Sequence, residues 1–331
     1  MLRALRSCPV RGHCYVPSSE GATHRLTRYL TVELSGRLLL RNSRMLLSCV
    51  VLASLHGIFL PQCAAAPAGE PSADKPAATG TSRALIIASI PGDEEHEEQF
   101  ARIIKDWQKS LTQALDFAAA DVHILFGKQP RDGLGKPATR EHFEKEIAEL
   151  SQTLKPADRL WVFFVGHANY DAEHAYFHMA GRDFSAEELA RHFAALRCRE
   201  QVFWITTPAS GWFMKAFSAK DRIVISATLA EDEYNETEFP EALATVLKRP
   251  RAELDTNHDG KVSILELYDL VIAEVNARFA KDKRIPTEHA QLDDNGDGQG
   301  SEKPAEKPGD AKGKSDGAVA AKTYVPFKRS G

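Results

Sequence analysis

The sequence predicts an α/β protein with a three-layer α/β/α domain on a mainly parallel central sheet, followed by a helical segment. Short, almost wholly apolar runs alternate with longer segments in which apolar residues recur at helical spacing. This alternation is typical of a parallel sheet covered by helices on both faces. The runs expected to form strands are residues 84–90, 121–126, 160–165, 201–207 and 221–227.

Helices are expected between these strands. The segment 100–117 carries apolar residues at helical spacing, and the acidic stretch before it suits the positive end of a helix dipole. Thr139 is a predicted N-cap for a second helix, and Ser185 with Glu188 predicts a capping box for a third. Strand–helix alternation of this kind predicts a sheet of about five or six strands, with 160–165 and 202–205 adjacent at its centre.

The chain divides into five parts by composition. Residues 1–66 are expected to be an N-terminal extension in which 45–66 form a signal peptide, with Met45 as an alternative start, Leu46–Leu60 as the apolar core and small residues at 64–66 for cleavage. A membrane anchor is the alternative, but Ser54, His56 and Gly57 interrupt the run. The remaining parts are a flexible linker (67–82), the α/β domain (83–250), an acidic helical segment (251–303) and a disordered tail (304–331), which 324–327 could anchor. The protein is therefore expected to be exported to the periplasm or the extracellular space, with no stable membrane span after cleavage.

Cysteine usage and charge exclude several classes of protein. Four of the five cysteines, Cys8, Cys14, Cys49 and Cys63, lie in the part expected to be removed. Cys198 is then alone, so no internal disulfide is expected, and it is interpreted as a small packed residue. The net charge is −4 and no basic stripe is present. This argues against nucleic acid as a partner, because neutralising phosphates requires clustered lysine and arginine.

Residues 255–266, which we call the acidic loop, have the spacing of an EF-hand calcium loop. Calcium takes six to eight oxygen ligands, which such a loop supplies from positions one, three, five, seven, nine and twelve, with glycine at six. Gly260 occupies position six, and an amphipathic helix is expected from 265 to 279. The predicted calcium ligands are Asp255, Asn257, Asp259, the carbonyl of Lys261, Ser263 and Glu266.

Residues 293–304, the second loop, repeat the first half of this pattern. Asp293, Asn295, Asp297 and the carbonyl of Gln299 have ligand spacing. Position twelve is Pro304, whose side chain cannot coordinate an ion. Weak binding, completion by other oxygens and a solvated turn all remain open for this loop.

A histidine and a small turn follow the two central predicted strands. His167 comes directly after the run 160–165, and the turn Pro208-Ala209-Ser210-Gly211 comes after 201–207. Ligands of open α/β sheets bind at the carboxyl ends of the strands. Over residues 83–250 this arrangement resembles the caspase/legumain-like cysteine peptidases, in which one strand ends in Gly-His and the next ends in a turn that carries the nucleophilic cysteine. Pro208 stands at the cysteine position, and proline has no thiol.

Two hypotheses for function follow from the resemblance and the acidic loop. The first is a secreted, calcium-binding pseudopeptidase of bacterial legumain-like type, whose His167 crevice holds a protein or peptide ligand. The second is a hydrolase in which His167 activates a hydroxyl nucleophile, with Ser210, Thr206 and Thr207 nearest in sequence. Pro208 at the cysteine position favours the first hypothesis.

Overall fold

The computed structural model describes residues 80–129, 133–305 and 315–328, all within one compact unit of the chain. Its centre is a six-stranded sheet with the order β2-β1-β3-β7-β8-β9. Every neighbouring pair is parallel except β8 and β9, which are antiparallel. The strands are β1 (Ser82–Ala88), β2 (Phe117–Phe126), β3 (Arg159–Val165), β7 (Glu200–Ile205), β8 (Arg222–Ser226) and β9 (Gln291–Asp293).

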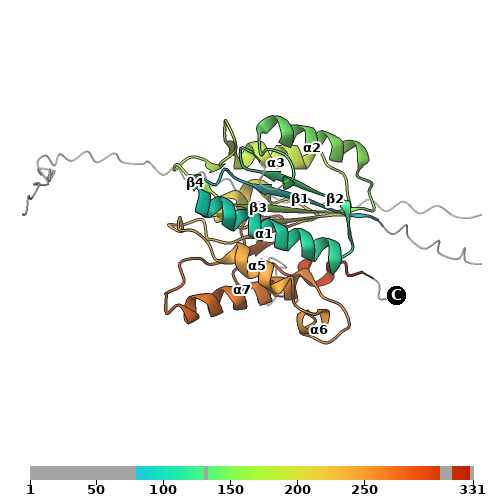
Figure 1. Ribbon diagram of the computed structural model, residues 1–331. Helices are drawn as coiled ribbons and strands as arrows, with labels where there is room; N and C mark the ends of the chain where they lie inside the picture. The colour runs from blue at the N-terminus through green and yellow to red at the C-terminus, as the bar shows by residue number, and fades with distance from the viewer. Residues whose placement is uncertain (1–79, 130–132, 306–314, 329–331) are drawn as a thin grey trace, which may run out of the picture. The chain divides into compact units, whose positions relative to one another are not determined.

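Helices cover both faces of this sheet (Figure 1). α2 (Arg140–Thr153) and α3 (Ala186–Ala194) lie on one face, and α1 (Glu94–Gln113), α5 (Phe239–Val246) and α7 (Ile264–Lys281) lie on the other. The expectation of a mainly parallel α/β fold with helices on both faces is confirmed. The remaining elements are α4 (Met214–Phe217), α6 (Arg251–Leu254) and a small antiparallel sheet of β4 (Ala168–Tyr170), β5 (Ala175–Phe177) and β6 (Phe184–Ser185).

The central strand β3 shows why the apolar runs form buried strands. Successive side chains of a strand point to opposite faces, so an entirely apolar strand can contribute to two cores. Trp161 and Phe163 belong to the core under α1, α5 and α7, whereas Val162 and Phe164 belong to the core under α2, α3 and α4. Both faces of β3 are therefore sealed.

The helix boundaries follow their capping residues. Asp93, Thr139 and Ser185 each accept a hydrogen bond from a backbone N–H in the first turn of α1, α2 and α3. The predicted N-caps at Thr139 and Ser185 are confirmed, and the latter forms the expected capping box with Glu188. The first helix begins at Glu94, six residues before the apolar spacing starts, because Asp93 caps the acidic stretch.

The C-terminal part differs from the expected disordered tail. Residues 315–328, which we call the C-terminal segment, pack against the domain. The backbone N–H of Val325 donates to the carbonyl of Val262, and Phe327 forms a bridge with Leu115 at the far end of α1. The expectation that 324–327 anchor the chain end is met. Composition alone predicted disorder for residues 315–328, but a few buried residues such as Ala320 and Val325 pack this segment against the domain.

Other expectations lie partly outside the described residues. The signal peptide at 45–66 and the cysteines at positions 8, 14, 49 and 63 fall in residues 1–79, which the structure does not describe. Cys198 is a free, half-buried thiol. Within the described ranges no helix combines the length and apolar character needed to cross a membrane.

Candidate functional site

β3 and β7 are neighbours, and the residues that follow them meet at one edge of the sheet. Phe164 pairs with Ile205 in parallel register, so the two strands end side by side. His167 and Pro208 both line the same cavity there, which has a volume of only about 20 Å³. The expected adjacency of these two residues is confirmed. A cavity of this size holds at most a water molecule.

Gly166 places His167 by a close approach of the backbone. Its φ is +108°, and a Cβ at this position would lie 2.1 Å from the Oγ of Ser89, so only glycine fits. The Ser89 hydroxyl accepts a hydrogen bond of 2.6 Å from the backbone N–H of His167. The Gly-His pair is thus fixed by Ser89, the residue after β1, as well as by its own strand.

The imidazole of His167 is held by a backbone carbonyl. Its Nε2 lies 2.8 Å from the carbonyl oxygen of Pro91, and because a carbonyl only accepts, Nε2 carries the proton. The ring also packs edge-on against Phe100 and His96, at centroid distances of 5.5 and 5.1 Å. Within the described ranges no hydroxyl group is hydrogen-bonded to this ring. The arrangement orients His167 without pairing it with a nucleophile.

Ser210 is unsuited to act as that nucleophile. It is fully buried, and its Oγ accepts hydrogen bonds from the backbone N–H groups of Ala227 (2.9 Å) and Thr228 (3.0 Å). Its hydroxyl also lies 3.2 Å from the Oγ1 of Thr228. These contacts join the turn after β7 to the end of β8, which is a structural role.

The two threonines before Pro208 are also buried. Thr206 donates its hydroxyl to the carbonyl of Phe164 at 2.7 Å, which ties β7 to β3. The Oγ1 of Thr207 is buried without a hydrogen-bond partner. Neither hydroxyl is hydrogen-bonded to His167.

A second histidine beside His167 was not singled out from the sequence. His96 lies between two carboxylates: its Nδ1 is 2.7 Å from Asp93, and its Nε2 contacts Glu236. The hydrogen bond to Asp93, followed by that to Glu236, raises the pKa of His96. Helical geometry explains the first contact, but Glu236 is 140 residues away, and no local pattern in the sequence predicts that pairing.

In the acidic loop the first three predicted ligands turn their oxygens toward the backbone of the loop. Asp255 accepts hydrogen bonds from the N–H groups of Asp259 (3.1 Å) and Gly260 (2.9 Å), and Asn257 also accepts from Asp259 (2.8 Å). Asp259 in turn accepts from Lys261 (2.8 Å). Gly260 has a φ of +82°, which a glycine adopts without strain. The oxygens at positions one, three and five are therefore gathered on the inside of a tight turn.

Glu266 closes this loop from its twelfth position. Its Oε1 accepts from the backbone N–H groups of Thr256 (2.9 Å) and Asn257 (3.1 Å), and its Oε2 accepts from the N–H (2.8 Å) and hydroxyl (2.9 Å) of Ser263. Burial acts to raise the pKa of Glu266, but these hydrogen bonds outweigh it and the pKa lies below its usual value. The carboxylate is thus ionised. Some of these hydrogen bonds must be exchanged before both oxygens can bind one ion.

The second loop has the same arrangement in its first half. Asp293 accepts from the N–H groups of Gly296 (3.0 Å) and Gly298 (2.9 Å), Asn295 accepts from Asp297 (2.8 Å), and Asp297 accepts from Gln299 (2.8 Å). The predicted ligand residues of this loop are therefore brought together as they are in the acidic loop.

Asp316 lies where a twelfth ligand is missing from the second loop. Ser263, at position nine of the acidic loop, donates its hydroxyl to Glu266, and Ser301, at position nine of the second loop, donates to Asp316 at 2.6 Å. Burial, together with the nearby charges of Asp293 and Asp294, raises the pKa of Asp316 to about 6. Sequence reasoning missed Asp316 because it lies within residues 304–331, which were expected to form a disordered tail.

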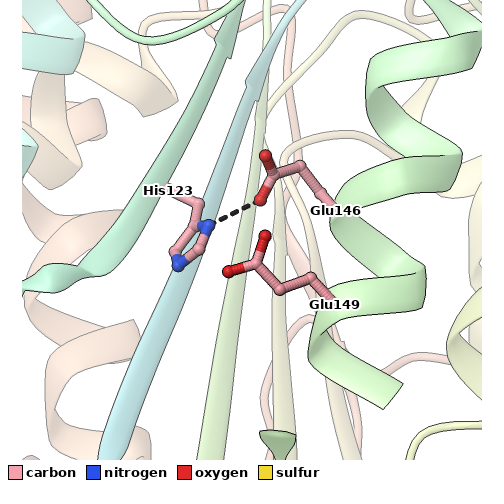
Figure 2. A group of neighbouring side chains, drawn as sticks. All are labelled: His123, Glu146 and Glu149. Atoms are coloured by element: carbon pink, nitrogen blue, oxygen red, sulfur yellow. Dashed lines mark hydrogen bonds and ion pairs between the residues drawn. The ribbon is translucent and has the colours of Figure 1, made fainter. Parts of the chain in front are cut away.

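A third group of side chains combines a histidine with two carboxylates (Figure 2). His123 on β2 faces Glu146 and Glu149 on α2, with ligand atoms all within 4.8 Å of one another. Within the described ranges it is the one set of three or more histidine, cysteine or acidic side chains that meets this spacing. The carboxylates of the acidic loop do not meet it, so they must draw closer to share an ion.

A lysine already balances the charge of this group. Glu146 is 1% exposed, and it contacts His123 Nδ1 at 2.5 Å through one oxygen and the ammonium of Lys136 through the other. Burial acts to raise the pKa of Glu146, but the hydrogen bonds from Lys136 and His123 lower it overall. The charge of buried Glu146 is therefore balanced by His123 and by the exposed Lys136, and we take this ion pairing as the role of the cluster.

Comparisons with known proteins add little to this geometry. No protein family description and no curated protein matches the sequence. One solved structure to which the chain is similar is protein GSU0716 from Geobacter sulfurreducens, at 14% identity, with 64% of this chain and 92% of that chain covered. The TM-score is 0.40, so the likeness carries no functional argument.

Proposed function

We propose that this protein is an exported calcium-binding protein whose caspase/legumain-like domain is a catalytically inactive pseudopeptidase that acts as a binding module. The observation that carries the proposal is the acidic loop, an EF-hand-type loop with oxygen ligands at all six required positions and the first three already turned inward. Export is inferred from residues 45–66.

The acidic loop gives calcium a direct effect on stability. α7 begins at Ile264, inside the loop, and buries Leu267, Tyr268 and Val271 against the sheet. An ion that binds only the folded loop therefore stabilises the domain by mass action. Extracellular calcium modules work at about 10⁻⁴–10⁻³ M. At 10 mM calcium such a site contributes roughly 1.4–2.7 kcal/mol, which corresponds to a rise of roughly 3–10 °C in melting temperature.

The test is calorimetry on metal-free protein, with calcium compared against magnesium at equal ionic strength. Wild type and the matched control Glu253→Ala, an exposed acid just outside the loop, are expected to gain stability with calcium. Glu266→Ala removes the twelfth ligand and is expected to abolish the gain. An equal calcium-dependent rise in all three proteins would show that the acidic loop is not the site.

The second loop is proposed as a weaker calcium site, with Asp316 as the group that substitutes for Pro304. Isothermal titration of wild type is then expected to show two calcium events, and Asp316→Asn is expected to remove the weaker one alone. Pro304→Glu, which supplies a carboxylate at position twelve, is expected to strengthen that event. A single event that both variants leave unchanged would limit calcium to the acidic loop.

Several observations support a domain without peptidase chemistry. Pro208 replaces the expected nucleophile, the cavity beside His167 holds about 20 Å³, and the nearby hydroxyls of Ser210 and Thr206 are bonded to other groups. The domain is expected to leave fluorogenic peptide substrates uncleaved and to resist labelling by thiol probes selective for caspase-like sites. Cleavage that disappears in His167→Ala would instead establish the alternative, a hydrolase with a hydroxyl nucleophile.

A further inference from the structure

A large pocket lies at the end of the sheet opposite His167. It has a volume of about 770 Å³, within the roughly 300–1,000 Å³ of small-molecule sites. Its walls come from the end of α3, the segment leading into β7, and the connection between α4 and β8. Four cationic side chains line it, and we call it the basic pocket: Arg191, Arg197, Lys220 and Arg222.

Arg222 is the buried member of this set. It is 7% exposed, and its guanidinium donates from Nε to the Oε1 of Gln201 (3.0 Å) and from Nη1 to the carbonyl of Phe217 (2.9 Å). Both acceptors are neutral, and no carboxylate of the described residues forms an ion pair with it. Burial lowers the pKa of Arg222, which reflects the cost of an uncompensated charge. The fold holds this guanidinium in place by two hydrogen bonds but leaves its charge unbalanced.

The other three cations line the same pocket as Arg222 and have no neutralising partners among the described residues. Arg191, Arg197 and Lys220 are exposed, and in the part of the chain that the structure describes none of them forms an ion pair. Glu187 and Asp221 are the carboxylates of the lining. Four positive and two negative side chains leave an excess of two positive charges.

We propose that the basic pocket binds a small molecule bearing a phosphate group, with Arg222 as its fixed anchor and Arg191, Arg197 and Lys220 closing over the anion. Guanidinium groups match phosphate oxygens with paired hydrogen bonds, and a phosphate dianion matches the charge excess of the pocket. The basic pocket shares no lining residue with the acidic loop or with the His167 edge, but it adjoins the second loop, where Gly296 lies against the backbone of Ala219 and Lys220.

The alternative is that Arg222 only anchors the end of α4 through the carbonyl of Phe217. Binding experiments separate the two roles, because an anchoring arginine needs no anion. Pyrophosphate and phenyl phosphate serve as probes in calcium-free buffer, with sodium chloride at equal ionic strength as the salt control. The double variant Arg197→Gln/Lys220→Gln changes only exposed side chains and leaves Arg222 in place, so it is expected to fold.

Wild type is expected to bind pyrophosphate saturably in isothermal titration, and the double variant is expected to bind it at least about tenfold more weakly, since two charge-assisted contacts are lost. Lys145→Gln, an exposed lysine of α2 outside the pocket, is the control for the loss of a surface positive charge and is expected to bind within about twofold of wild type. Arg222→Lys keeps the charge but loses the planar pair of donors, so weaker binding is expected, together with a lower melting temperature because Gln201 or the carbonyl of Phe217 loses its hydrogen bond.

Three results would overturn the proposal. The first is a response to pyrophosphate no larger than that to chloride. The second is equal binding by the double variant and Lys145→Gln. The third is tighter binding of tricarballylate than of either phosphate probe, which would assign the basic pocket to polycarboxylates.

Discussion

At the scale of single residues, the buried carboxyl groups differ in how many donors face them. Glu146 and Glu266 receive hydrogen bonds at both oxygens, and each has a pKa below its usual value despite burial. Glu288 receives a backbone N–H at one oxygen, whereas its Oε2 is buried without a partner, and burial raises its pKa to about 8. Near neutral pH Glu146 and Glu266 are therefore ionised and Glu288 is mainly protonated. Their contributions to the free energy of unfolding can be told apart by varying the pH.

Glu288→Gln is expected to change the pH dependence of stability. Because the folded pKa of about 8 lies above the ordinary 4.5, the folded state binds the extra proton and wild-type stability falls as pH rises between these values. Above about pH 8 the loss is complete. Glutamine is neutral throughout, so the variant is expected to be more stable than wild type at pH 9. Urea denaturation from pH 5 to 9 measures this, and parallel curves for the two proteins would contradict it.

Glu146→Gln is expected to act in the opposite direction. The folded pKa of Glu146 lies below 4.5, so its ionised form contributes stability above that value, and the contribution is lost as pH falls through the folded pKa. Glutamine leaves Lys136 without its charged partner, and we expect a loss of about 1–3 kcal/mol at pH 7 that shrinks in acid. Glu144→Gln, an exposed acid of the same helix outside this group, is the control and is expected to change stability by less than about 0.5 kcal/mol.

Sequence reasoning located residues whose partners are near in sequence and missed those whose partners are distant. The ligand pattern of the acidic loop spans only twelve residues, so the spacing alone predicts which side-chain oxygens lie together on the inside of the turn. Glu146 bonds to His123, 23 residues away and on another element, and Ser301 bonds to Asp316 across 15 residues that include an undescribed segment. Such pairs depend on tertiary packing, which no local pattern encodes.

At the scale of elements, the acidic loop is joined to the end of the chain. Val262, at its eighth position, accepts a hydrogen bond of 2.8 Å from the N–H of Val325, and Ile264 donates one of 2.8 Å to the carbonyl of Thr323. Ser263 and Tyr324 form the bridge between these bonds. The C-terminal segment thus aligns the loop with the start of α7.

Val325→Pro is expected to weaken this junction. Proline removes the N–H that Val262 accepts and leaves a carbonyl without its partner, at a cost of about 1–3 kcal/mol. If the acidic loop binds calcium, its affinity is expected to fall as well. Val325→Ala keeps the N–H and loses only the side chain, so a comparison of the two variants by thermal denaturation and calcium titration isolates the hydrogen bond. Equal effects of the two substitutions would assign the role to side-chain packing.

The elements that the sequence predicted correctly have strong local signals. The apolar runs of the five parallel strands enter the two cores, and Thr139 and Ser185 cap helices at the predicted points. β9 was missed because it is a three-residue strand that includes Asp293, and because its antiparallel pairing with β8 joins residues far apart in the chain. A short edge strand has too few side chains to show a period.

At the scale of the whole molecule, the C-terminal third completes the fold. α7 buries Tyr268, Val271 and Phe279 in the same core as Trp161 of the central strand, and β9 covers the edge of β8. Each such side chain contributes roughly 1.5–3 kcal/mol when buried. A chain that ends at Pro250 is therefore expected to lose its cooperative thermal transition and to bind hydrophobic dyes. A chain of residues 80–331 is the control that keeps the transition, and a folded 80–250 fragment would show that the α/β domain is autonomous.

The hydrogen bond between Val262 and Val325 has a consequence for dilution. Both partners belong to one chain, so the C-terminal segment that flanks the acidic loop is present at a fixed local concentration, whatever the amount of protein in solution. A loop that needed a second molecule for this contact would lose ion affinity as the protein is diluted. Here the apparent dissociation constant for calcium is expected to be the same at nanomolar and at micromolar protein. Calcium occupancy of the loop would then depend on the free calcium concentration and not on the protein concentration.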